Sequence, residues 1–420
     1  MSKWPITSLK GKINIKHGFP FKSEYFSDEA TQFIVLTPGN FYEEGGFKRQ
    51  AGKEKFYTGD IPEEYLHQAG DLIVAMTEQA AGLLGSCARV PESGIYLHNQ
   101  RLGLVTTDSK KILRDYIYHL FKTRTVREQI RLTSSGSKVK HTSPERIYDV
   151  RVPLPTVSEQ QNIVALLDAL ETKIELNNRI NAELEAMAKT LYDYWFVQFD
   201  FPDDSPQGQG KPYKTSGGKM VYNPALKREI PEGWSDKTLS EIANITMGQS
   251  PEGSSYNDEG IGTIFYQGST DFGWLFPTTR QYTTAPRRMA KKADILLSVR
   301  APVGDMNIAN ADCCIGRGLA ALNSKTGSDG FLFYVMKYFK QVFDRRNSEG
   351  TTFGSITKND LHSLTLAYPT SDLLKKYDVI VTNYNKMIFD RSLENRELIA
   401  LRDWLLPMLI NGQISVGENG

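Results

Sequence analysis

Residues 142–196 read TSPERIYDVRVPLPTVSEQQNIVALLDALETKIELNNRINAELEAMAKTLYDYWF, and residues 356–410 read ITKNDLHSLTLAYPTSDLLKKYDVIVTNYNKMIFDRSLENRELIALRDWLLPMLI. The two stretches align without a gap, so that Pro155 falls on Pro369, 214 positions later (369 − 155). Solenoid repeats have periods of about 20 to 50 residues. A period this long indicates a domain duplication instead.

Both copies predict a long helix with a coiled-coil seam. Apolar residues recur at alternating steps of four and three, from Ile163 to Trp195 in the first copy and from Tyr377 to Leu409 in the second. Asn181 and Asn395 occupy the same seam position, where a polar side chain costs stability but can fix the register. We therefore predict that the two helices pair antiparallel. The alternative is that each Asn is exposed on a surface helix.

The sequence in front of each helix predicts a mixed α/β domain with short strands. In the first domain we expect strands near 32–36, 72–76, 88–90 and 102–106 and a helix over 113–132; in the second, strands near 263–266, 295–299 and 319–322 and a helix over 330–345. The predicted order is domain 1 (1–152), first long helix (153–201), linker (202–233), domain 2 (234–368), second long helix (369–412) and tail (413–420). The linker is rich in Pro, Gly, Ser and Lys, which is typical of a loop.

Composition narrows the class of protein. The net charge is +1, but positive charge is concentrated locally. For example, residues 276–300 contain six Lys or Arg and a single acidic residue, Asp294. No window approaches the roughly 20 apolar residues that span a bilayer, and the N-terminal residues lack the apolar core of a signal peptide. We predict a cytoplasmic chain that does not enter a membrane. The three cysteines show neither a disulfide framework nor a metal spacing, and we expect buried thiols and no metal site.

No motif for catalysis is present. The sequence has no phosphate-binding G-x-x-x-x-G-K-[ST], no dinucleotide fingerprint, no H-E-x-x-H and no G-x-S-x-G, and its six histidines are scattered. We therefore predict no catalytic residues and no cofactor bound by this chain.

Three motifs together resemble a known family. They are PLPTVSEQQ (153–161), LYDYWF at the end of the first helix (191–196), and DILLSVRAPVG (294–304) followed by GRGL (316–319). This combination resembles the specificity (S) subunit of Type I restriction-modification systems, over nearly the whole chain. The resemblance implies two target recognition domains, each reading one half of a bipartite, asymmetric DNA sequence, and a coiled coil that holds them apart.

The resemblance also implies partners. Two methyltransferase (M) subunits would supply S-adenosylmethionine and methylate adenine. Two restriction (R) subunits would hydrolyse ATP with Mg²⁺, translocate DNA and cut it. The short tail after Ile414 leaves open whether the two ends of the chain meet, as the family's near-circular arrangement would require.

Residues that contact phosphates give affinity, and residues that reach base edges give specificity. On the predicted helix 113–132, basic residues at i, i+3 and i+7 share one face that suits a phosphate backbone, although a solvated face is the alternative. Two loops, 133–141 and 350–358, combine Gly, hydroxyl and basic residues, which suits close approach to phosphates, although they could also be idle loops. The phosphate candidates are Arg124, Arg127, Arg131, Lys138, Lys140, Thr351, Thr352, Ser355 and Lys358.

Arg suits guanine, and Gln or Asn suits adenine. The base-reading candidates are Arg280, Arg287, Arg288 and Arg300 in domain 2, and Lys48, Arg49, Gln50 and Gln79 in domain 1. Arg101 and Arg317 align with each other. Because specificity should diverge between the domains, we expect each of them to brace a carboxylate instead.

Acidic residues on the first helix are candidates for docking M subunits, with a solvated charged face as the alternative; they are Glu171, Glu175, Glu183 and Glu185. Two other functions remain open at this point. The chain could be a self-contained DNA methyltransferase or nuclease, or a protein-interaction scaffold that binds no DNA.

Overall fold

The computed structural model describes residues 3–78, 82–206, 208–348 and 355–416. Contacts divide the chain into two compact units, one of Met1–Glu175 with Arg396–Gly420 and one of Leu176–Asn395. Each unit contains one α/β domain and a part of both long helices, α4 (Val157–Tyr192) and α8 (Ser371–Ile410). Among the residues that the structure describes, none of the helices could span a bilayer.

The domain of the first unit is built on an antiparallel sheet of order β2-β10-β6-β8. Its strands are β1 (Ile6–Ser8), β2 (Ile13–His17), β3 (Phe26–Ser27), β4 (Phe33–Val35), β5 (Phe56–Tyr57), β6 (Leu72–Ala75), β7 (Thr77–Glu78), β8 (Cys87–Arg89), β9 (Tyr96–Leu97), β10 (Leu102–Thr107), β11 (Lys140–His141) and β12 (Arg151–Pro153). Its helices are α1 (Arg114–Phe121), α2 (Arg124–Leu132) and α3 (Pro144–Tyr148), with the short turns η1 (Ser23–Tyr25), η2 (Pro38–Asn40) and η3 (Glu63–Tyr65).

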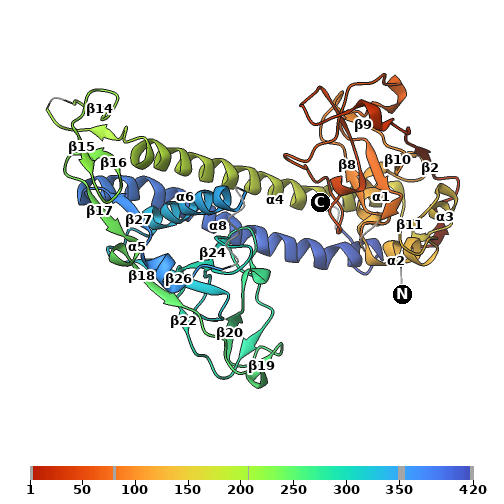
Figure 1. The fold of residues 1–420 in the computed structure, drawn as a ribbon. Helices are drawn as coiled ribbons and strands as arrows, with labels where there is room; N and C mark the ends of the chain where they lie inside the picture. Colours follow the sequence, from red (N-terminus) through yellow and green to blue (C-terminus); the bar gives the residue numbers. More distant parts are fainter. Residues whose placement is uncertain (1–2, 79–81, 207, 349–354, 417–420) are drawn as a thin grey trace. The chain divides into compact units, whose positions relative to one another are not determined.

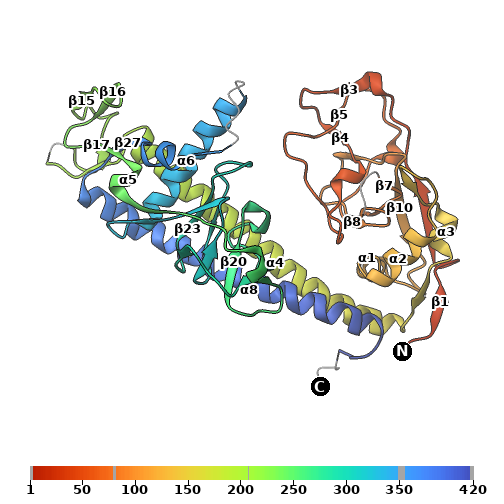
Figure 2. The ribbon, with the colours of Figure 1, turned by 60° about the horizontal axis from the view of Figure 1, so that its bottom comes forward.

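Strand β6 is buried on both faces, and its side chains point alternately into two separate core clusters. Leu72 and Val74 point into a cluster with α1 and α2, whereas Ile73 and Ala75 point into a second cluster with Leu36. Figure 2 shows α1 and α2 beside the sheet strands. The second cluster joins this sheet to the smaller one of order β3-β5-β4-β9.

The second unit repeats this plan. Its domain has strands β17 (Ser235–Thr238), β18 (Ala243–Met247), β19 (Tyr256–Asn257), β20 (Thr263–Tyr266), β21 (Tyr282–Thr283), β22 (Met289–Ala290), β23 (Ile295–Ser298), β24 (Met306–Ile308), β25 (Cys313–Ile315), β26 (Leu319–Ser324) and β27 (Thr365–Tyr368). Its helices are α5 (Leu239–Ile242), α6 (Asp329–Ser348) and α7 (Lys358–His362), with η5 (Gly253–Ser255) and η6 (Ser269–Asp271). The sheet order β18-β26-β23-β24 matches β2-β10-β6-β8, and β19-β21-β20-β25 matches β3-β5-β4-β9.

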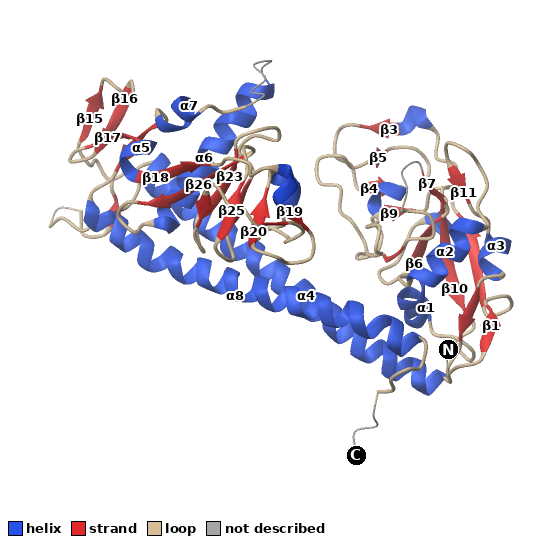
Figure 3. Ribbon diagram, turned by 90° about the horizontal axis from the view of Figure 1, so that it is seen from below, coloured by secondary structure: helices blue, strands red, loops and turns tan. Residues whose placement is uncertain are grey.

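The repeated topology confirms two α/β domains related by an internal duplication. Antiparallel pairing of α4 with α8 is confirmed as well, and the two helices run side by side in Figures 1 and 3. In the first unit Ile163 and Leu167 of α4 share a core with Leu406 and Leu409 of α8. In the second unit the Tyr377 hydroxyl donates to the Ala188 carbonyl at 3.3 Å.

The two seam asparagines are buried, with 1% of Asn181 and 6% of Asn395 exposed. They do not bond each other. Asn177 donates to the Asn395 Oδ1 at 2.9 Å, Asn395 donates to Asn178 at 2.8 Å, and Asn181 donates to the Ser392 hydroxyl at 3.3 Å. Their role in fixing the register stays a prediction.

Two expectations about local structure are wrong. The predicted helix over 113–132 is two helices, because Thr123 adopts an extended backbone (ψ 141°) and its hydroxyl donates to the Leu120 carbonyl at 2.7 Å. The predicted linker 202–233 is not simply a loop. It forms two hairpins, β13 (Pro202–Asp203) with β14 (Lys211–Pro212), and β15 (Met220–Asn223) with β16 (Arg228–Pro231).

Residues near the start of the chain contact the end of α8 in the first unit. The Lys3 amide donates to the Asn411 carbonyl at 2.8 Å, and the Trp4 indole donates to the Leu409 carbonyl at 3.4 Å. Gly412 lies so close to Trp4 that a Cβ there would be 2.6 Å from the indole. These contacts answer the question that the short tail left open.

Candidate nucleic-acid interface

A polar hollow of about 720 Å³ opens in the domain of the second unit. Three arginines line it, Arg280, Arg300 and Arg317, and all three are exposed. Gln267 and Gln281 add amide groups to the same wall. The hollow therefore presents several hydrogen-bond donors in one place, as recognition of base edges requires.

Arg300 lies next to one of the two loops that were predicted to approach phosphates. Ser355, at the described end of that loop, forms a backbone bridge with Arg300, and the Ile356 amide donates to the Val299 carbonyl at 2.8 Å. The structure thus brings Ser355 and Arg300 together, although the sequence suggested them separately. Lys358 follows at the start of α7 and is exposed. Thr351 and Thr352 lie outside the described residues.

The first domain has the same arrangement. The Thr142 amide donates to the Met76 carbonyl at 3.0 Å, and strand β11 pairs with β7, with Lys140 opposite Glu78. The loop that carries Lys138 and Lys140 therefore runs beside the segment that follows Met76, and both lysines are exposed. Gln79 lies outside the described residues.

Several candidate base readers are held by carboxylates. Arg280 donates through Nε to the Asp271 Oδ1 at 2.8 Å, and Arg287 lies 3.5 Å from Glu252. Arg288 is exposed, and its carbonyl accepts from the Ile315 amide at 2.9 Å. A pre-oriented guanidinium keeps free N–H groups for a ligand, so these pairs do not exclude base contact.

In the first domain, Arg49 forms an ion pair with Glu92, whose hydrogen bond raises the pKa of the arginine. Arg49 also lies 3.4 Å from the Tyr96 hydroxyl. The Lys48 ammonium is 5.8 Å from the ring of Tyr42.

The three arginines of helix α2 do not act alike. Arg124 is exposed and pairs with Glu128 at 2.8 Å, and Arg131 is exposed. Arg127 instead donates to the carbonyls of Leu84 at 3.0 Å, Glu43 at 2.9 Å and Gly82, and burial lowers its pKa. Its guanidinium therefore holds the main chain at Gly82 and Leu84 next to Glu43, which the i, i+3, i+7 spacing could not reveal.

The expectation for Arg101 and Arg317 is wrong in two respects. Main-chain hydrogen bonds align Leu102 with Leu319, since Leu102 donates to the Asn99 carbonyl at 2.9 Å and Leu319 to the Gly316 carbonyl at 3.0 Å. Gln100, not Arg101, therefore corresponds to Arg317. Within the ranges that the structure describes, neither guanidinium makes an ion pair with a carboxylate.

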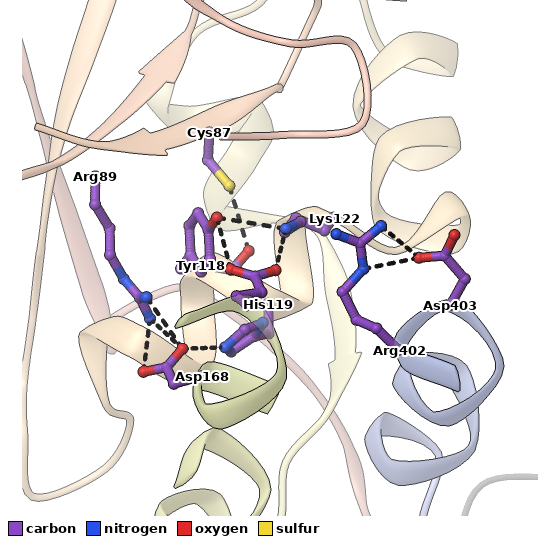
Figure 4. A network of polar contacts seen from close by, with 9 residues as sticks. Cys87, Arg89, Tyr118, His119, Lys122, Asp168, Arg402 and Asp403 are labelled. Carbon is purple, nitrogen blue, oxygen red and sulfur yellow. Dashed lines mark hydrogen bonds and ion pairs between the residues drawn. The ribbon is translucent and has the colours of Figure 1, made fainter. Parts of the chain in front are cut away.

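A network of polar contacts attaches the first domain to helix α4 (Figure 4). Arg89 holds Asp168 through two nitrogens, each 3.0 Å from Oδ1, and His119 Nε2 lies 2.7 Å from the same oxygen. The Tyr118 hydroxyl donates to Glu171 at 3.0 Å, and Lys122 forms an ion pair with Glu171. The Cys87 thiol nearby is buried, which raises its pKa to about 12.

This network corrects the docking prediction for two of the acidic residues. Glu171 is 9% exposed and engaged by Tyr118 and Lys122, and Glu185 forms an ion pair with Lys337 in the second unit. Neither is a free acidic group on an outer face, because the domain helices α1 and α6 pack there. Glu175 and Glu183 are exposed. Burial and the neighbouring Glu171 raise the pKa of Glu175.

His119, Asp168 and Glu171 bring their ligand atoms within 4.8 Å of one another. Arg89 and Lys122 already neutralise the two carboxylates, so their charge is balanced without a cation. The three cysteines are buried and unpaired, as the sequence predicted.

Comparison with known proteins agrees with this architecture. The family described as "Type I restriction modification DNA specificity domain" matches residues 1–186 and 231–382. The "Putative type I restriction enzyme MjaX specificity subunit" of Methanocaldococcus jannaschii is 30% identical over 378 residues, which cover 86% of this chain and 83% of the relative. The type I restriction enzyme EcoBI specificity subunit of Escherichia coli is 26% identical over 318 residues, covering 74% and 63%.

Among solved structures, the crystal structure of a Type I restriction-modification S subunit from M. genitalium has the same fold. Its TM-score is 0.63 at 15% identity, over 97% of this chain and 96% of that one. A duplicated α/β domain, a shared helix pair and a family match over both copies all agree. The chain belongs to the DNA specificity subunits of Type I restriction-modification systems, which are the non-catalytic subunits of these complexes.

Proposed function

We propose that each α/β domain reads one half of a bipartite DNA target and that the paired helices set the distance between the two halves. The observation that carries this proposal is the polar hollow lined by Arg280, Arg300 and Arg317. Its donors suit guanine edges, and the adjoining Ser355 loop suits phosphates. The first domain presents Lys138 and Lys140 at the corresponding loop.

The proposed partners are double-stranded DNA, two M subunits and two R subunits. The M subunits would carry S-adenosylmethionine, and the R subunits would carry ATP and Mg²⁺, in the cytoplasm. The exposed residues Glu175 and Glu183 remain candidates for docking. Met187 on α4 and Leu401 on α8 are better ones, because they are 52% and 44% exposed and occupy equivalent places in the repeat. Two equivalent apolar sites would suit two copies of one partner.

A binding measurement tests the proposal. Purified chain in complex with its M subunits is titrated with duplexes of its methylated motif and of scrambled sequence, at several salt concentrations. We expect affinity for both duplexes to fall with salt, because bound cationic side chains displace counterions, and we expect the motif to bind more tightly throughout. Equal affinity for motif and scrambled DNA would contradict base reading by either domain.

Residue substitutions then assign the halves. Arg300→Ala should weaken methylation that depends on one half-site and leave the other half unchanged. Lys138→Ala with Lys140→Ala should lower affinity for all sequences alike, since phosphates carry no sequence information.

A further inference from the structure

One turn has the same backbone in both domains but a different exposed side chain. In the first domain it runs from Asn99 to Leu102 and closes with the 2.9 Å bond between the Leu102 amide and the Asn99 carbonyl. In the second it runs from Gly316 to Leu319 and closes at 3.0 Å. The third residue of each turn accepts from the segment after the buried strand: Arg101 from Met76 at 3.0 Å, and Gly318 from Val299 at 2.9 Å.

A glycine packs closely against the backbone of each turn. A Cβ on Gly18 would lie 2.1 Å from the Asn99 carbonyl oxygen, and a Cβ on Gly248 would lie 2.1 Å from that of Gly316. Both glycines also donate to the turn's last residue, Gly18 to Leu102 at 3.3 Å and Gly248 to Leu319 at 2.9 Å. The backbone of the turn is therefore fixed by close packing that tolerates no side chain.

The second residue of the turn is Gln100 in the first domain and Arg317 in the second. Both side chains are exposed. Neither makes a hydrogen bond or ion pair with any residue that the structure describes, unlike Arg280 and Arg49, which carboxylates hold. Arg317 faces the polar hollow together with Arg300. Two side chains that lack a partner among the described residues are thus held at equivalent positions of the same closely packed turn.

The chemistry of these two side chains differs in the way that base recognition requires. A glutamine amide forms two hydrogen bonds with adenine, and a guanidinium forms two with guanine. Building on the proposed function, we propose that Gln100 and Arg317 are the equivalent specificity-determining residues of the two domains. Gln100 selects adenine in one half-site, and Arg317 selects guanine in the other.

The test uses the full chain assembled with its M subunits and a library of duplexes randomised in both half-sites, with methylation read by sequencing. Arg317→Gln should lower the preference for guanine at one position of one half-site by about 10- to 100-fold and leave the other half-site unchanged. Gln100→Arg should do the reverse, weakening an adenine preference in the opposite half-site.

Controls separate this idea from the proposed function itself. Lys375→Ala, which removes an exposed charge on α8, should change neither half-site. A uniform loss of methylation on every sequence in Arg317→Gln would overturn the inference, because it would make Arg317 a phosphate contact. A wild-type complex whose products show no bipartite motif would overturn the proposed function instead. Equal thermal unfolding of all variants excludes misfolding as the cause.

Discussion

The hydroxyl of Tyr118 lies 3.0 Å from the Oε2 atom of Glu171, within the network that attaches the first domain to helix α4. Lys122 neutralises the same carboxylate, and only 7% of its side chain is exposed, against 11% for Glu171. Removing one partner of a buried pair leaves an uncompensated charge. The network should therefore matter more to stability than an ion pair on the surface.

Lys122→Met should lower the free energy of unfolding by about 3–5 kcal/mol, because Glu171 stays buried without its cation. Urea denaturation of the purified chain measures this. Lys110→Met, at an exposed lysine on the same domain, should be close to neutral. The double variant Lys122→Met with Glu171→Leu should recover much of the loss, and a double variant as unstable as the single one would argue against the ion pair as the cause.

The same network predicts sensitivity to acid. Burial alone would raise the pKa of Glu171, but Lys122, His119 and Tyr118 outweigh it and hold the pKa below 4.5. For Asp168 burial also acts upward, and His119 and Arg89 outweigh it. Because both folded-state pKa values are lowered, the stabilisation is complete above the unfolded pKa values and is lost as pH falls through the folded ones.

We therefore expect the thermal midpoint to fall steeply in the acidic half of a scan from roughly pH 7 to pH 3. Glu171→Gln should flatten that fall while lowering the midpoint near neutrality. An unchanged slope in this variant would show that other carboxylates govern the acid response.

Asn395→Ala should cost about 1–3 kcal/mol, because the buried amide of Asn177 loses its acceptor in the helix seam and the exposed Asn178 loses its donor. Asn383→Ala on the same helix is the matched control, since among the described residues that exposed amide bonds only the Val379 carbonyl. Replacing Asn177 and Asn395 together by Leu should restore or exceed the original stability. Chemical denaturation of the three variants decides between these outcomes.

Gly248→Ala should disrupt the turn beneath Arg317, since the new Cβ would meet the Gly316 carbonyl oxygen at 2.1 Å. We expect a loss of about 1–3 kcal/mol in stability and weaker recognition of one half-site in methylation sequencing. Gly253→Ala in the same domain meets nothing within 4 Å and should be silent. Equal behaviour of the two variants would refute the packing argument.

Deleting residues 178–184 together with 388–394 removes seven residues from each helix. The remaining residues of α4 and α8 stay opposite their original partners. The helices shorten by about 10 Å at 1.5 Å per residue. If they set the spacing, the DNA spacer should shorten by about three base pairs at 3.4 Å per step. Methylation sequencing of the variant reads the spacer directly, and an unchanged spacer would count against the helices as a ruler.

The sequence predicted what depends on period and on duplication. The seam from Ile163 to Trp195 determined the long helices, and the gapless repeat determined two similar domains. It failed where a single residue redirects the chain, as at Thr123, and where short hairpins form within a polar segment, as in 202–233. The sequence alignment paired Arg317 with Arg101 instead of Gln100, an error of one residue, because that turn has no apolar pattern to anchor an alignment. The ion pair and the hydrogen bond that engage Glu171 could not be predicted, because the partner residues are distant in sequence.

The contact between Lys3 and Asn411 has a consequence for synthesis on the ribosome. The second unit is one continuous segment, Leu176–Asn395, and all of it has been made before the last turns of α8 emerge. The first unit needs Leu406, Leu409 and Ile410 to cover Ile163 and Leu167. The part of this core that α8 covers therefore forms only after the last turns of α8 have been made, later than the whole of the second unit.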